Sequence, residues 1–219
     1  MRNLLALCLF VICSISSEAQ SKDDTLFFMN GEFLTAKVVD TANFMVHCKY
    51  IRKGKEHDLT VDRERLFGIK YGSGDERIYY YYDTMVGNYF TVEETKRFIY
   101  GEHDALMGYH PRMDFIGGFL VGFGVAIKIS INDSVFYSIP TIITPIPVFA
   151  YTALVTLLPR IKGNKKKITN QAYIKDDSYL IGYERIARKK KFFSALTGGV
   201  AGILSAALVN ILVFHEKIQ

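Results

Sequence analysis

Four residues near the middle of the chain carry side chains that could bind a metal ion or transfer protons. Glu102, His103 and Asp104 are consecutive, and His110 lies two helical turns beyond His103, where it could share its face. A metal site needs three or four converging ligands, and a nucleophile with its base and orienting group cannot be assembled on one helix face. We therefore predict a solvated helix face here, with no catalytic residue, no metal ligand and no cofactor.

The helix that carries these residues has clear end signals. Thr91 and Glu94 have the spacing of a capping box, in which each side chain bonds the backbone of the other. Pro111 ends the helix, because the residue before a proline is pushed out of the helical region. The pattern predicts an amphipathic helix as the segment 91–112.

The segment before this helix has the pattern of a small β domain. Short strand-like runs alternate with turn signals from residue 24 to about 83, without any proline, and Asn30-Gly31 is a strong hairpin signal. We expect five or six strands in an antiparallel barrel or sandwich over residues 20–90. One side of it should form the core, through Phe33, Ala36, Val38, Phe44, Val46 and Cys48.

The order of turns in this segment resembles that of small SH3-like or Sm-like barrels. It consists of an apolar strand, Asn30-Gly31, a longer strand ending at Asp40, and then Asn43-Phe44-Met45-Val46. In Sm-like proteins this layout supports RNA binding. An exported domain meets no RNA, so we expect no nucleic-acid partner.

The second half of the chain contains three long apolar segments, at residues 115–131, 135–158 and 192–214. The last two carry no charged residue and are long enough to cross the roughly 30 Å hydrocarbon core as helices. The predicted fold class is therefore α+β, in which the β domain precedes a membrane domain of three apolar helices over residues 113–219.

The N-terminus has the pattern of a secretory signal over residues 1–19. Arg2 precedes an apolar run at residues 4–13, and small residues follow at Ser17 and Ala19. Cleavage after Ala19 would leave Gln20 as the mature N-terminus, whereas an uncleaved signal would stay as an anchor, and we favour cleavage. Export by this signal predicts a protein of the bacterial inner membrane with its β domain in the periplasm; association with the outer membrane stays open.

A basic segment lies between the last two apolar segments. Residues 159–191 contain eleven Lys or Arg and three acidic residues, so they carry +8 while the rest of the chain sums to −3. A basic block between membrane segments favours anionic lipid headgroups, at about 1 kcal/mol per residue. The predicted headgroup contacts are Lys165, Lys166, Lys167, Arg188, Lys189, Lys190 and Lys191.

Glycines in two of the apolar segments have the spacing of close helix packing. Gly118 and Gly122, like Gly198 and Gly202, lie one helical turn apart, which lets two helix backbones approach. A dinucleotide loop would need a preceding strand. We predict packing contacts at Gly117, Gly118, Gly122, Gly198, Gly199 and Gly202.

These glycines also belong to a weak internal repeat. Gly101 precedes Gly117 by sixteen residues, and Gly182 precedes Gly198 by the same number. Each unit is an amphipathic helix that leads into a glycine-rich apolar helix. Duplication and chance are both open.

The run from Phe98 to Ala105, with Tyr109 and Gly117-Gly118, resembles a group of exported bacteroidete membrane proteins of unassigned function. That group combines a signal peptide, a small β domain, a Gly-x-x-Asp-Ala helix and glycine-rich membrane segments. The resemblance implies an architecture and no mechanism.

Two topology rules conflict in this chain. Export of the β domain and three spans would put the basic loop outside the cytoplasm, against the tendency of Lys/Arg-rich loops to stay inside. Both rules hold if residues 115–131 only re-enter or lie at the interface. We lean to this two-span topology.

These observations predict a non-enzymatic structural or interaction protein of the envelope, which forms a homo-oligomer or binds another envelope protein. The alternative is a small transporter or channel subunit. Its polar path would use Lys128, Asn210 and breaks at Pro140, Pro145 and Pro147. Lys128 lies near its segment's end, however, where a lysine can reach the headgroups.

Overall fold

The computed structural model describes residues 23–131, 134–137, 145–157 and 169–214. The predicted signal and Lys165–Lys167 lie outside these residues. The chain divides into a β unit, Met1–Met29 with Phe33–Tyr80, and a helical unit, Asn30–Glu32 with Tyr81–Gln219. Each unit is described by itself.

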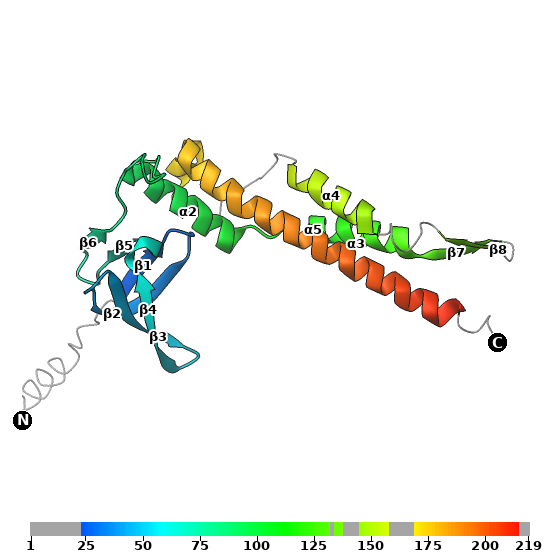
Figure 1. Ribbon diagram of the computed structural model, residues 1–219, viewed down its shortest axis with the longest axis horizontal. Coiled ribbons are helices and arrows are strands. Elements are labelled where there is room, and N and C mark those ends of the chain that lie inside the picture. Colours follow the sequence, from blue (N-terminus) through cyan, green and yellow to red (C-terminus); the bar gives the residue numbers. More distant parts are fainter. Residues whose placement is uncertain (1–22, 132–133, 138–144, 158–168, 215–219) are drawn as a thin grey trace, which may run out of the picture. The chain divides into compact units, whose positions relative to one another are not determined.

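The β unit is one antiparallel sheet of six strands in the order β4-β3-β2-β1-β5-β6 (Figure 1). Because β4 and β6 form its two edges, the sheet is open, and the predicted closure into a barrel is not found. A short 3-10 helix, η1 (Arg63–Arg65), precedes the strand that returns to β1. The strands are β1 (Asp24–Phe28), β2 (Phe33–Asp40), β3 (Met45–Arg52), β4 (Lys55–Asp62), β5 (Leu66–Lys70) and β6 (Glu76–Ile78).

Left-handed turn residues and a small apolar core define this sheet. Lys53 and Gly54 both have positive φ, 53° and 76°, as the tight turn between β3 and β4 requires. Cys48 is buried, as expected for a strand residue, in a core with Leu26, Ala36, Val46, Val61, Leu66 and Ile69. The prediction for Phe44 was wrong. It lies in the β2–β3 turn with φ 61°, outside the strand alternation, and its side chain is 77% exposed.

The helical unit contains four α-helices in the described residues. The capping box at Thr91 and Glu94 is confirmed, because both reciprocal hydrogen bonds are present at the start of α2. The elements are α2 (Val92–Gly108), α3 (Arg112–Ala126), β7 (Lys128–Ile131), β8 (Ser134–Tyr137), α4 (Pro145–Leu157), η3 (Gln171–Lys175) and α5 (Asp177–Phe214).

In the described residues, three full-length apolar helices are not found. The first two apolar segments each divide into a helix and a strand, and the strands pair as the hairpin β7–β8. Two features of the sequence account for this. Isoleucine, valine and aromatic residues in 129–137 favour strands, and proline excludes a helix interior, so α4 begins at Pro145.

Of the described helices, only α5 is long and apolar enough to cross a membrane, over Asp177–Leu212. It has 38 residues, which corresponds to about 57 Å. Helices α3 and α4, with 15 and 13 residues, reach only about 20 Å each. The described lengths of α3 and α4 are therefore each shorter than the roughly 30 Å core.

Helices α2 and α3 follow one another along α5, and α4 packs on α3 and α5 (Figure 1). Gly118 faces Ala195, and four residues later Gly122 faces Gly199, so α3 and α5 run parallel. The order is reversed for α4, because its Val148 faces Gly199 while its later Tyr151 faces Gly117. Helix α4 therefore runs antiparallel to α3.

Candidate functional site

The three residues that could have formed a catalytic cluster turn to different partners. Glu102 bonds Arg185, Asp104 bonds residues at the start of α5, and His103 Nδ1 lies 3.1 Å from the carbonyl oxygen of Gly31. His110 lies beyond Gly108, where α2 ends, so the two histidines do not share a helix face. In the described part of the chain, no three His, Cys, Asp or Glu residues gather as a metal site.

Asp104 is the centre of a buried polar cluster that ties α2 to the chain before α5. Its Oδ2 accepts the backbone N–H of Thr169 at 2.8 Å and the hydroxyl of Tyr179 at 2.9 Å. Its Oδ1 accepts the Thr169 hydroxyl at 2.5 Å. Three hydrogen bonds to one buried carboxylate stabilise a single arrangement of these segments. The sequence could not reveal this cluster, because its members lie more than sixty residues apart.

Glu102 is a second buried carboxyl group, 1% exposed, one residue after Gly101. Its Oε1 accepts a hydrogen bond from Arg185 at 3.1 Å, and its Oε2 has no partner among the described residues. Burial raises the pKa of Glu102 to about 7, while the Arg185 guanidinium acts in the opposite direction. The group therefore changes its protonation near neutral pH.

Three pairs of glycines bring helix backbones into direct contact. A Cβ added at any of the six would come closer than 3.0 Å to a carbonyl oxygen of the opposite helix. In every pair, the oxygen belongs to the residue three before the partner glycine, as in close parallel packing with Cα–H···O contacts. The pairs are Gly101 with Gly182, Gly118 with Gly198, and Gly122 with Gly202.

The two remaining predicted packing glycines face α4. Gly117 lies against the Tyr151 ring, and Gly199 lies against the Val148 side chain. Gly101 of α2 and Gly118 of α3 therefore occupy equivalent positions and lie seventeen residues apart. Their partners in α5, Gly182 and Gly198, lie sixteen residues apart. The break between α2 and α3 takes up the extra residue.

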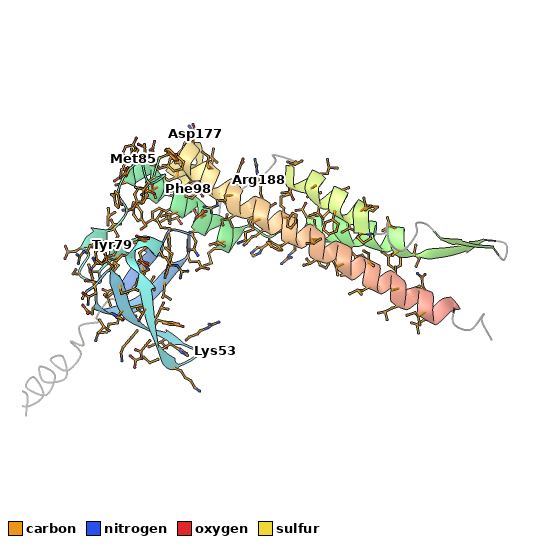
Figure 2. All side chains as sticks on the ribbon, in the orientation of Figure 1. Lys53, Tyr79, Met85, Phe98, Asp177 and Arg188 are labelled. Carbon is orange, nitrogen blue, oxygen red and sulfur yellow. The ribbon has the colours of Figure 1, made fainter. Side chains whose placement is uncertain are left out.

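The predicted headgroup residues on α5 have different surroundings. Lys190 Nζ donates to the carbonyl oxygens of Ala105, Leu106 and Tyr109 at 3.1, 2.5 and 3.1 Å, and so caps the end of α2. Lys191 is buried. Arg188 (Figure 2) and Lys189 are exposed, and Arg188 also pairs with Glu184 at 2.8 Å.

Two adjoining hollows lie at the break between α2 and α3, of about 390 and 490 Å³. His110, Pro111 and Ser194 line both. Ser194 donates its hydroxyl to the carbonyl oxygen of Pro111 at 2.8 Å, which fixes the break against α5. This junction is the candidate binding site of the helical unit.

Only part of the set of residues considered for a polar path lies in the described structure. Asn210 donates its side-chain N–H to the carbonyl oxygen of Ala126 at 2.9 Å, at the end of α3. Pro145 is the first residue of α4. The Lys128 side chain and Pro140 lie outside what the structure describes.

Comparison with known protein families, characterised proteins and solved structures finds no match to this chain.

Proposed function

We propose that this chain is a membrane-anchored interaction protein of the bacterial cell envelope, without catalytic activity of its own. Its helical unit holds α5 in the bilayer, and its β unit docks a protein partner. The observation that carries the proposal is the exposed aliphatic surface of the helices. Leu204, Leu208 and Leu212 of α5 are 60, 62 and 74% exposed.

This surface distinguishes α5 from the core helix of a water-soluble protein. A core helix buries its large apolar side chains, whereas here they point outward from α3 and α4 as well, at Leu120, Leu154 and Leu157. Continuous exposed aliphatic surface is unfavourable in water, at about 25 cal/mol per Å². Lipid chains remove that cost, and the glycine contacts then hold the helices together where no hydrophobic effect acts between them.

The directions of the helices support a topology in which most of the polar groups lie on one side of the membrane. Helix α3 leads the chain away from α2 and antiparallel α4 leads it back, so α4 ends at Leu157 on the side of α2. Thr169 then bonds Asp104 of α2. We place the β unit, α2 and the basic residues of α5 on the same side. With an exported β unit this is the periplasm, contrary to the two-span expectation.

Exposed apolar residues at the β2–β3 turn support docking by the β unit. Val39 and Met45 flank Phe44, and all three are exposed. The Arg63 guanidinium lies 5.8 Å from the centre of the Phe44 ring. The partner is an envelope protein or a second copy of the chain.

The experiment is extraction and crosslinking in cells that express the full chain. The protein should stay in the membrane fraction at alkaline pH, and a short amine crosslinker should give one defined larger species. Phe44→Ser should remove that species. Ile51→Ser is the matched control, because Ile51 is 78% exposed but lies at the other end of β3. Extraction into the soluble fraction, a monomer only, or equal loss in both variants would contradict the proposal.

A further inference from the structure

The α2–α3 junction combines apolar walls with cationic side chains. Ile186 and Phe193 line the first hollow together with Lys189, while Phe115 and Ile116 line the second together with Arg112. The volumes of about 390 and 490 Å³ lie in the range of roughly 300–1,000 Å³ that is usual for ligand sites. The two hollows share His110, Pro111 and Ser194 and therefore adjoin one another.

The Lys and Arg side chains that line the two hollows in the described structure are Arg112, Lys189 and Lys190. Arg112 and Lys189 are exposed, and neither forms a salt bridge with a described residue. No acidic side chain lines either hollow in the described structure. The nearest acid in sequence, Asp114, is not among the lining residues. The site is therefore complementary to an anion.

The start of α3 also presents backbone N–H groups here. Pro111 provides no side-chain cap in the described residues, the Arg112 N–H donates to the carbonyl oxygen of His110 at 3.0 Å, and Asp114 lies in the first turn. The N-terminal end of a helix carries partial positive charge and N–H groups that favour phosphate. The carbonyl oxygens at the end of α2, which would repel an anion, are already bonded by Lys190.

The position of the site selects the source of the anion. It lies where the basic run of α5 ends at Lys191 and the uncharged run begins at Phe192, that is, at the expected boundary of headgroups and lipid chains. We propose that the junction binds one anionic phospholipid. Its phosphate contacts Arg112 and Lys189, and an acyl chain lies against Phe193 and Phe115. This inference rests on the proposed membrane location.

The test is lipid titration of the purified full chain in an uncharged detergent, with bound lipid counted by native mass spectrometry. Dioleoyl phosphatidylglycerol should saturate one site at least tenfold more tightly than dioleoyl phosphatidylcholine. The double variant Arg112→Gln/Lys189→Gln should lose this preference, and Lys189→Arg should keep it. Both changes are at exposed positions, so circular dichroism should be unchanged.

Arg188→Gln is the matched control, since Arg188 is an exposed cation next to Lys189 that lines neither hollow. It should change the affinity less than twofold. An equal loss of lipid affinity in the control would show that general surface charge, and not this site, binds the lipid. Equal affinity for both lipids would also refute the inference. Competition by glycerol 3-phosphate at the same concentration as the lipid would refute the lipid assignment. Because the titration uses purified protein, it can fail while membrane extraction and crosslinking succeed.

Discussion

Replacing Gly122 by alanine should separate α3 from α5. An added Cβ would come closer than 3.0 Å to both the carbonyl carbon and the carbonyl oxygen of Gly199, with the Cα at 3.0 Å. All three are backbone atoms, so no side chain can rotate away, and the helices must move apart. Gly124 is the matched control in the same helix, because its added Cβ would meet nothing within 4 Å.

The magnitude follows from two opposing effects. At either position, alanine stabilises the helix by about 0.5–1 kcal/mol relative to glycine. Overpacking of a tight contact costs about 1–3 kcal/mol, and only Gly122 has such a contact. We therefore expect Gly124→Ala to be neutral or stabilising. Gly122→Ala should lower the free energy of unfolding by about 1–3 kcal/mol relative to Gly124→Ala.

The assay is reversible unfolding of the purified chain in mixed micelles with increasing sodium dodecyl sulfate, followed by circular dichroism. The difference between the two variants is the quantity of interest, since both carry the same chemical change two residues apart. Equal free energies of unfolding would show that α3 and α5 are not in backbone contact at Gly122. That result would refute the close packing of α3 on α5 in the helical unit.

Three further predictions concern the buried polar groups and the topology. Asp104→Ala should lower the free energy of unfolding by about 3–5 kcal/mol, because three hydrogen-bond donors lose a buried carboxylate. Amide hydrogen exchange of residues 177–190 should then be at least a hundredfold faster, and unchanged exchange would contradict this. Folding raises the pKa of Glu102 from 4.5 to about 7, so the folded state binds this proton more tightly than the unfolded state. The free energy of unfolding should therefore fall as the pH rises from about 4.5 to about 7, by up to about 1.4 kcal/mol per pH unit. Glu102→Gln should remove this dependence in chemical denaturation at a series of pH values. Single cysteines at Ser73 and Gln171, in a chain without its natural cysteines, should react with an impermeant maleimide from the same side of the membrane; reaction from opposite sides would refute the return of the chain through α4.

Local signals predicted the parts of the fold that depend on neighbouring residues. The capping box at Thr91 acts over three residues, and the hairpin signal at Asn30-Gly31 acts over two, so each could be recognised without the rest of the chain. The burial of Cys48 followed from alternation within one strand. Phe44 was misjudged because the chain leaves the strand conformation there, which alternation alone cannot show.

The parts that sequence reasoning missed depend on distant residues. Lys190 belongs to a basic run, which suggested lipid contact, yet it bonds carbonyl oxygens more than eighty residues earlier in the chain. Hydropathy also could not divide residues 115–131 and 135–158 into helix and hairpin, because apolar strands and apolar helices have the same composition. Pro145 and Pro147 lie in the first turn of α4, where a proline is tolerated, and so mark the start of a helix rather than a break within one.

The break between α2 and α3 has a physical reason for its position. Helix α5 continues without interruption, whereas α2, which packs on it, ends at Gly108 and α3 begins at Arg112. An interrupted helix leaves carbonyl groups that need donors, and in hydrocarbon each unsatisfied group costs several kcal/mol. The donors here are Lys190 and Ser194, both on α5 at the point where its charged run gives way to its apolar run. A lysine can serve only at that level, since its charge needs water or headgroups nearby. The glycine pairs on either side of the break keep α2 and α3 close to α5, so the interruption leaves a hollow without separating the helices.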